Sequence, residues 1–255
     1  MVRGLYTAWT GLQNEQKRLD VISNNIANAA TTGYKQEGVT SQSFDDMLAI
    51  KVKDYSVKKD EVIGDMTLGV KVGEVYTNYE QGSIRFTGNS FDLALNGTGF
   101  FKIKVVDAAG QEHIRYTRAG NYAITREGYI TDTDGNRLQG EAGDLVVPTN
   151  KEIVIDANGY VFASDQIIDR LSVVDFEDYD YLKKYANTMY EPAEGAVQID
   201  ATATVRQGYL EQSNVNVVKE MVQMIAITRA YEANQKIVQT TDKTLDQAVN
   251  SVGRV

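Results

Sequence analysis

The sequence predicts an α+β protein, with long N- and C-terminal helices that pair in a coiled-coil-like layer and a central, mostly antiparallel β domain. An apolar seven-residue repeat at each end predicts the helices, and β-branched and aromatic runs between turn signals predict the strands. The chain of 255 residues then divides into an N-terminal helix and turn (1–45), a connecting arm (46–70), a central β domain (71–205) and a C-terminal helix (206–255).

The N-terminal helix is predicted by apolar residues at alternating spacings of four and three. The repeat consists of Leu5, Trp9, Leu12, Leu19 and Ile26, with Gln16 and Ser23 completing the frame. This spacing places the side chains on one face of a helix. Thr32-Gly33 predicts the end of the helix, because glycine readily adopts the left-handed conformation of a C-cap.

The middle of the chain has the pattern of β structure. The runs FFKIKVV, LVV and IVI predict strands. Between such runs stand pairs typical of tight hairpins: Asn96-Gly97, Glu127-Gly128, Asp134-Gly135 and Asn158-Gly159. Frequent turns favour antiparallel strands over βαβ units. The segment 46–70 carries mixed charges and no clear period, so we expect a connecting arm there.

The C-terminal helix has the clearest signal. Ser213, Asn214 and Asn216 are N-cap candidates, and a four-three frame then continues from Val217. One column of the frame is apolar throughout: Val217, Met224, Tyr231, Val238, Leu245 and Val252. The other column is apolar only at its ends: Met221, Thr228, Gln235, Asp242 and Val249. A sustained 3.5-residue period predicts coiled-coil-type packing.

The predicted lengths leave apolar surface without cover. A helix of about 36 residues is roughly 54 Å long, which exceeds the diameter of the central domain and the length of the N-terminal helix. A second stripe, with Ile227, Ala230, Ile237 and Ala248, widens the apolar face. We therefore predict an assembly interface at Leu5, Trp9, Leu12, Leu19, Asn24, Asn25, Ile26, Asn28, Val217, Met221, Met224, Tyr231, Val238 and Leu245. The alternative is a pair of helices that cover each other completely within one chain.

Three asparagines stand in the segment NNIANAATTGYK (24–35), although asparagine is a poor interior helix residue. Asn24 and Asn28 are one turn apart on the same face, with Asn25 beside them. Polar groups at a helix interface fix register at some cost in stability. We predict that these amides hold neighbouring subunits at one axial offset. The alternative is that they face solvent near the helix end.

Composition excludes several kinds of chemistry. A net charge of −9 disfavours nucleic acid as a partner, and the absence of cysteine excludes disulfides and thiol chemistry. TDTDGNRL (131–138) lacks the closing glutamate of a calcium loop, and NGTGFF (96–101) lacks the third glycine of a phosphate loop. We predict no catalytic residue, no cofactor and no metal. No apolar run is long enough for direct membrane insertion, and the N-terminus lacks the features of a cleaved secretory signal.

Four segments resemble the family of bacterial flagellar rod, hook and hook-associated axial proteins. They are LYTAWTGLQNEQKRLDVISNNIANAATTGYK (5–35), GNSFDLALNGTGFFKI (88–103), YTRAGNYAITREGYITDTDGNRLQG (116–140) and QGYLEQSNVNVVKEMVQMIAITRAYEANQK (207–236). They occur in the family's order and cover most of the chain except about 46–70 and 141–205. Among family members, the length is similar to that of the two larger rod proteins, and the Ser-Asn-Val-Asn stretch and the Asn-Asn-x-Ala-Asn motif most resemble distal rod proteins.

The resemblance implies a structural subunit of the flagellar basal-body rod and not an enzyme. Such a subunit polymerises helically through its terminal helices into the hollow drive shaft between motor and hook, outside the cytoplasmic membrane. The implied partners are the chain itself, other rod and hook proteins and the flagellar type III export apparatus, with ring proteins around the rod as further candidates. The alternatives are the larger proximal rod protein or another axial protein. An alternative of a different class is an extracytoplasmic carbohydrate-active enzyme with paired carboxylates.

Overall fold

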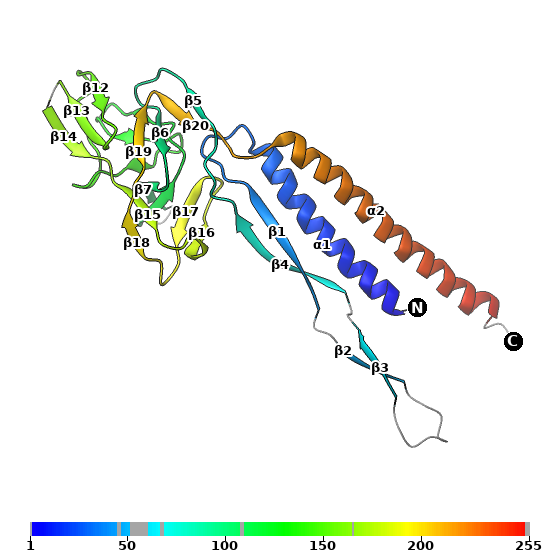
Figure 1. Ribbon diagram of the computed structural model, residues 1–255. Helices are drawn as coiled ribbons and strands as arrows, with labels where there is room; N and C mark the ends of the chain where they lie inside the picture. The colour runs from blue at the N-terminus through cyan, green and yellow to red at the C-terminus, as the bar shows by residue number, and fades with distance from the viewer. Residues whose placement is uncertain are drawn as a thin grey trace. The chain divides into compact units, whose positions relative to one another are not determined.

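The computed structural model describes residues 2–44, 47–51, 61–66, 69–107, 110–164 and 166–252, which belong to two units of the chain. The first unit consists of Met1–Ile26, Glu37–Thr77 and Val217–Val255, and the second of Ala27–Gln36 and Asn78–Asn216. An N-terminal helix, a C-terminal helix and antiparallel strands between them confirm the predicted α+β class in this form (Figure 1).

The two long helices belong to the first unit. They are α1 (Val2–Ala27) and α2 (Val217–Gln247). A π-helical turn, η2 (Ala248–Val252), follows directly after α2. Asn25 near the end of α1 bonds to Glu220 near the beginning of α2, and a Cβ atom on Gly11 would lie 3.0 Å from Nδ2 of Asn234. These two contacts mean that the helices run side by side and antiparallel (Figure 1).

The end of α1 differs from the prediction. The helix stops at Ala27, before the predicted Thr32-Gly33. The backbone N–H of Thr31 donates to the carbonyl of Asn28 at 3.1 Å, and the Thr31 hydroxyl donates to the Asn28 side-chain oxygen at 3.2 Å. These bonds connect residues three apart and form a tight turn. The helix therefore ends before Gly33, which was the predicted C-cap.

The first unit also contains a long antiparallel hairpin. Its strands β1 (Glu37–Ser43) and β4 (Val70–Thr77) pair from Glu37↔Thr77 to Ser43↔Val70, with an irregularity between Val39 and Ser41. Within the segment predicted as an arm, β2 (Met47–Lys51) pairs with β3 (Glu61–Met66). The Ser41 hydroxyl donates to Oδ1 of Asn14 at 3.0 Å, so β1 contacts one side of α1.

The second unit consists of antiparallel sheets. Its largest sheet has nine strands among the described residues: β7 (Phe100–Val106), β8 (Glu112–Thr117), β9 (Ala123–Ile124), β10 (Ile130–Thr131), β11 (Arg137–Leu138), β15 (Val173–Phe176), β16 (Leu182–Lys184), β17 (Met189–Pro192) and β18 (Gln198–Asp200). Smaller sheets pair β12 (Ile153–Ile155), β13 (Tyr160–Ala163) and β14 (Gln166–Arg170); β6 (Leu93–Asn96) and β19 (Thr204–Gln207); and β5 (Ile84–Phe86) and β20 (Tyr209–Glu211). A 3₁₀ turn, η1 (Tyr179–Tyr181), precedes β16.

Most local predictions in the second unit are confirmed. FFKIKVV is β7, IVI is β12, and TDTDGNRL forms the hairpin turn between β10 and β11. The predicted strand LVV (145–147) is wrong. Val146 makes an isolated bridge with Tyr129, and the following Pro148 lacks the N–H that a continuing ladder requires.

The core of the second unit has two clusters of buried residues. One is mainly aliphatic and gathers residues of β6, β7, β10, β12 and β13 around Phe101 and Val161. The other is aromatic: Phe100 makes edge-on ring contacts with Tyr190 and Phe176, and Phe176 makes one with Tyr116. Tyr34 is also fully buried, so the segment that follows α1 is part of this unit.

Candidate assembly surface on the terminal helices

One side of α2 is covered within the first unit. The column predicted to be apolar throughout is half-buried at Val217, Met224, Tyr231, Val238 and Leu245. The side chain of Val252 lies outside the described residues. The second covered column is one residue away from the predicted one and consists of Glu220, Ile227, Asn234, Thr241 and Ala248. The predicted second column, Met221, Thr228, Gln235, Asp242 and Val249, faces outward.

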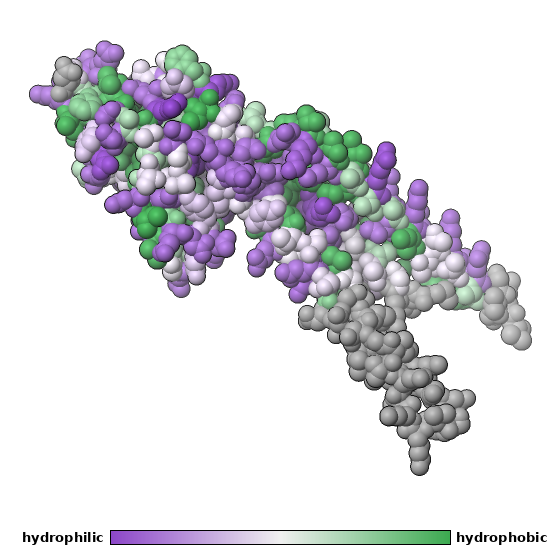
Figure 2. All heavy atoms as spheres, in the orientation of Figure 1, coloured by the Kyte–Doolittle hydropathy of each residue, from purple (hydrophilic) through white to green (hydrophobic). Residues whose placement is uncertain are grey.

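The uncovered side of α2 begins with a cluster of apolar residues. Val218 is 72% exposed, and Met221, Val222 and Ile225 are each at least half exposed. These four residues are spaced i, i+3, i+4 and i+7, so they share one face of the first three turns. We call them the α2 apolar patch. Figure 2 shows hydrophobic residues gathered over this part of the helix.

The predicted α1 residues lie at the margin of covered surface. Leu5, Leu12, Leu19 and Ile26 are half-buried, whereas Trp9 is 48% exposed and contacts Tyr6 with tilted rings whose centroids lie 6.0 Å apart. The apolar α1 residues that the described structure buries are Ala8, Val21 and Ile22. α1 is contacted both by α2 and by the β1–β4 hairpin, so a single apolar stripe could not identify its buried positions.

The three predicted asparagines have different surroundings. Asn25 is buried, and its amide donates to the carbonyl of Glu37 at 2.8 Å and to Oε2 of Glu220 at 3.2 Å. Its Oδ1 accepts from the N–H of Glu37 at 3.0 Å. Asn24 is exposed, and Asn28 is half-buried in the turn after α1. Asn25 therefore joins α1, β1 and α2 inside one subunit.

A buried ionic network in the second unit was not predicted. Nζ of Lys35 lies 2.6 Å from Oε1 of Glu211, and their side chains are 1% and 0% exposed. Nη1 of Arg118 lies 3.2 Å from the other carboxylate oxygen. Burial lowers the pKa of Lys35, and the Glu211 carboxylate opposes that shift. The network connects the Gly-aromatic-Lys end of the N-terminal motif with the C-terminal motif, which are 176 residues apart.

Two further contacts hold the same motifs in place. Gly33 has a φ of +69°, and a Cβ atom there would lie 2.4 Å from the N atom of Ala119, so the glycine permits this close approach. Asn214 accepts from the N–H of Gln36 at 2.7 Å and donates to the carbonyls of Asn78 and Glu80 at 2.9 and 3.1 Å. Asn214 was predicted as a cap candidate, but its described side-chain bonds join loop segments.

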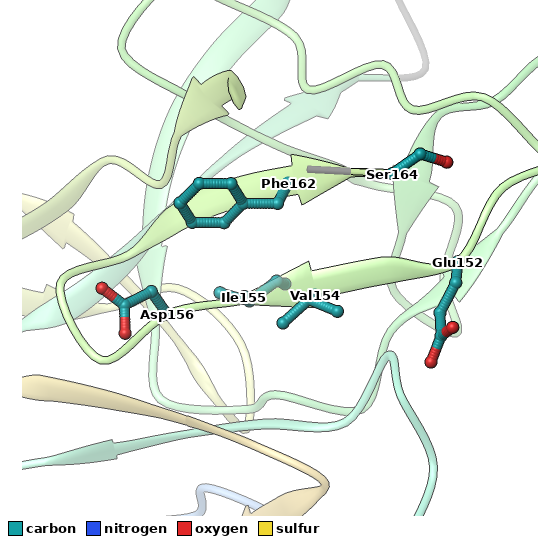
Figure 3. Close-up of a pocket in the computed structure, with 6 residues that line it drawn as sticks. All are labelled: Glu152, Val154, Ile155, Asp156, Phe162 and Ser164. Carbon is teal, nitrogen blue, oxygen red and sulfur yellow. The ribbon is translucent and has the colours of Figure 1, made fainter. Parts of the chain in front are cut away.

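A shallow groove of about 560 Å³ lies on the β12–β13 face. Glu152 and Asp156 stand at opposite ends of β12 with Val154 between them, as Figure 3 shows. Four residues of extended chain separate their Cα atoms by roughly 13 Å. Glycosidase carboxyl groups form a facing pair about 5–9.5 Å apart, whereas these two carboxylates extend from opposite ends of the strand (Figure 3), so the groove does not favour the enzyme alternative. Among the described residues, no cluster of three His, Asp or Glu side chains suits a metal ion.

No helix in the described part of the chain has the length and apolar character needed to cross a bilayer. The observations so far define a class of α+β protein whose paired terminal helices carry an uncovered apolar face. Such a face is typical of a subunit that binds other proteins.

Family models match three segments of the chain. A model described as flagella basal body rod protein matches residues 5–35, one described as flagellar hook protein FlgE/F/G D1 domain matches 94–163, and one described as flagellar basal body rod FlgEFG protein C-terminal matches 206–251. The chain is 31% identical to the flagellar basal-body rod protein FlgG of Bacillus subtilis (strain 168), over 98% of this chain and 99% of that protein.

Other relatives also match the chain from end to end. The flagellar basal-body rod protein FlgF of Caulobacter vibrioides (strain ATCC 19089 / CIP 103742 / CB 15) is 31% identical over 100% of both chains. The flagellar hook-basal body complex protein FlhO of Bacillus subtilis (strain 168) is 28% identical over 100% of both. The chain belongs to the flagellar basal-body rod protein family.

Proposed function

We propose that this chain is a structural subunit of the distal part of the flagellar rod. It polymerises helically through its terminal helices and so builds the hollow shaft between motor and hook. The observation that carries this proposal is the α2 apolar patch, which the subunit leaves uncovered. The full-length similarity to proteins named as basal-body rod proteins supports it.

In this proposal, neighbouring copies cover the uncovered helix faces. Fully burying an aliphatic side chain contributes about 1.5–3 kcal/mol, so the four patch residues together supply a substantial association energy. The contact joins different faces of two copies, and repeated contacts of this kind produce a helical filament. Coiled-coil-like pairing of the terminal helices, within and between subunits, forms the inner layer of the rod.

The residues predicted from the sequence divide into two roles in this assembly. Met221 and Trp9 are exposed and suit contacts between subunits, whereas half-buried residues such as Leu12 and Met224 suit the seam between the two helices. For Asn25 we propose that it holds α1, β1 and α2 together inside the subunit and does not contact a neighbouring subunit. Residues 1–45 and 206–255 contribute the axial helices, 46–70 the arm, and 71–205 the β domain.

The proposal includes partners and a location. The subunit is located in the basal body outside the cytoplasmic membrane, after export by the flagellar type III apparatus. It binds copies of itself and other rod and hook proteins, and ring proteins around the rod are further candidates. It has no catalytic activity and does not bind nucleic acid. The alternative of the larger proximal rod protein is not favoured, because proteins named FlgG from several bacteria match nearly the whole chain.

Substitution of the α2 apolar patch tests assembly. Val222→Glu with Ile225→Glu places two charges on the patch, and Gln239→Glu with Thr240→Glu places two charges on another exposed part of α2. Each variant replaces the native copy in cells, and purified basal bodies are imaged. We expect shortened rods for the patch variant and complete rods for the control. Complete rods built from the patch variant would contradict the proposal. A tag visible by electron microscopy then distinguishes the distal from the proximal position.

A further inference from the structure

The chain crosses between the first and the second unit at four points, which follow residues 26, 36, 77 and 216. Three short segments of the second unit border these points: 31–36, 78–83 and 208–214. We call them the first, second and third junction segments. Every covalent connection of the terminal helices and of the β1–β4 hairpin to the second unit leads into one of them.

Backbone hydrogen bonds join the three junction segments to one another. The N–H of Gly33, in the first segment, donates to the carbonyl of Glu211, in the third, at 2.9 Å. The N–H of Asn78, in the second segment, donates to a carbonyl of the first at 2.8 Å. The N–H of Gln212, in the third segment, donates to the carbonyl of Ser83, in the second, at 2.8 Å. Each segment therefore supplies one N–H group that another segment holds.

The Glu211 carboxylate adds a contact that all three segments share. Its Oε1 accepts from Nζ of Lys35 in the first segment at 2.6 Å and from the N–H of Gly82 in the second at 3.0 Å. Its Oε2 accepts from Nη1 of Arg118, which follows β8, at 3.2 Å. Loss of this one carboxylate would therefore remove a contact from every junction segment at once.

Arg118 is the member of the network that is attached to the core. Its Nη2 donates to the carbonyl of Gly97 at 2.9 Å, and its guanidinium carbon lies 5.3 Å from the ring centroid of Phe100, which belongs to the aromatic cluster. Tyr34 and Leu210 are buried apolar side chains of the first and third segments, but they belong to neither core cluster of the described residues. The burial of these segments is thus separate from that of the core clusters.

Opening the junction segments should require less free energy than opening the core. Burial of Lys35 and Glu211 removes their hydration, and water would compensate both charges again if the segments opened. Burial lowers the pKa of Lys35, as this loss of hydration predicts. Water offers no such compensation to the apolar side chains of the core clusters. Segments with few buried apolar contacts generally open at a lower free energy than the core.

We propose that the three junction segments open and close together as one cooperative unit and that the Glu211 carboxylate couples them. In the open state the sheets of the second unit stay folded, while the segments that lead to both terminal helices and to the β1–β4 hairpin are released in one step. This coupling is a property of the single subunit and does not depend on the proposed function.

Amide hydrogen exchange of the full-length isolated subunit tests the coupling. The N–H groups of Gly33, Asn78 and Gln212 report on one junction segment each, and the N–H groups that pair β7 with β8 report on the core. In the unchanged chain we expect one common protection factor for the three junction reporters and slower exchange in β7 and β8.

The first variant removes the shared contact. Glu211→Gln keeps the size of the side chain but removes its charge, and we expect the three junction reporters to exchange faster by a common factor of about tenfold or more. Glu80→Gln is the matched control, because the Glu80 side chain is exposed in the second segment, and we expect unchanged rates. If Glu211→Gln does not fold, Lys35→Met replaces it, since it leaves the pair of Arg118 and Glu211 in place.

A second variant separates the junction from the core. Ile103 is fully buried in the aliphatic cluster, so Ile103→Val weakens the core equally whether the junction segments are closed or open. We expect exchange in β7 and β8 to become several-fold faster, whereas the three junction reporters keep their rates.

Three results would overturn the inference. The first is an effect of Glu211→Gln, or of Lys35→Met in its place, that is absent or confined to one or two of the reporters, because the segments would then open independently. The second is an effect of the same size for Glu80→Gln. The third is faster exchange of the three reporters in Ile103→Val, because the segments would then open only when the whole unit unfolds. Rod assembly enters none of these measurements, so their outcome leaves the proposed function to its own test.

Discussion

In the second unit, Phe101 and Ile103 are both 0% exposed, whereas in the first unit several of the largest apolar side chains of α2 face outward. The second unit obtains its stability from its own core and from a buried ionic network. The helices of the first unit bury one side and leave the other uncovered. The two regions thus match the two requirements of the proposed polymerising subunit, which are a fixed fold and an interface that another molecule completes.

The largest effect is expected from the buried ionic network. Glu211→Ala would leave the cations of Lys35 and Arg118 buried without their carboxylate, and we expect a loss of about 3–5 kcal/mol in the free energy of unfolding. Urea denaturation of the isolated subunit measures this loss. The matched control is Glu141→Ala, which removes the exposed ion pair with Arg170 and should cost less than about 1 kcal/mol. Equal losses for the two variants would refute a structural role for the network.

A second pair of substitutions compares the two regions directly. Ile103→Ala removes a fully buried side chain and should lower the free energy of unfolding by about 2–5 kcal/mol. Ile225→Ala truncates an exposed residue of the α2 apolar patch, and in the isolated subunit it should change that energy by less than about 0.5 kcal/mol. Thermal and urea unfolding measure both. A large loss for Ile225→Ala would mean that the subunit itself covers the patch.

Sequence periodicity predicted the helices and most strands because these depend on neighbouring residues. It placed the apolar column Val217, Met224 and Tyr231 on the covered side of α2. It chose Met221 and not Glu220 as the next position of the frame, because an apolar residue fits a four-three spacing better than a carboxylate, whereas the structure covers Glu220. The buried Glu220 accepts a hydrogen bond from Asn25, which is 195 residues away in the chain and cannot be paired with it by a local pattern.

The buried network illustrates the same limit. Lys35 and Glu211 are ordinary surface residues by composition, and no local pattern indicates that they form a buried pair. The motif resemblance identified both segments as important but did not show that they meet. The failed strand at LVV has a local cause that was visible, since Pro148 follows it directly.

A moderate effect is expected at Asn214. Asn214→Ala removes one acceptor and two donor contacts that join Gln36, Asn78 and Glu80. Leaving these backbone groups without their partner should cost about 1–3 kcal/mol. The control is Asn187→Ala at an exposed position of the same unit. We expect faster amide hydrogen exchange around Gln36 and Asn78 in the first variant only. Unchanged exchange there would show that water replaces the asparagine without loss.

The smallest expected effect depends on pH and concerns Asp144 in the second unit. Burial would raise the pKa of Asp144, but hydrogen bonds from Lys104, Gln139 and Arg137 outweigh it and lower the pKa from 3.8 to about 2. Because the pKa is lower in the folded state, the ionised carboxylate stabilises the fold above about pH 4, and this contribution is lost as the pH falls toward 2. Asp144→Asn should therefore remove part of the acid sensitivity of unfolding. The partly exposed setting limits the effect to about 1 kcal/mol or less. Urea midpoints of both proteins between pH 5 and pH 2 measure it, and parallel pH profiles would contradict the stabilising role of this carboxylate.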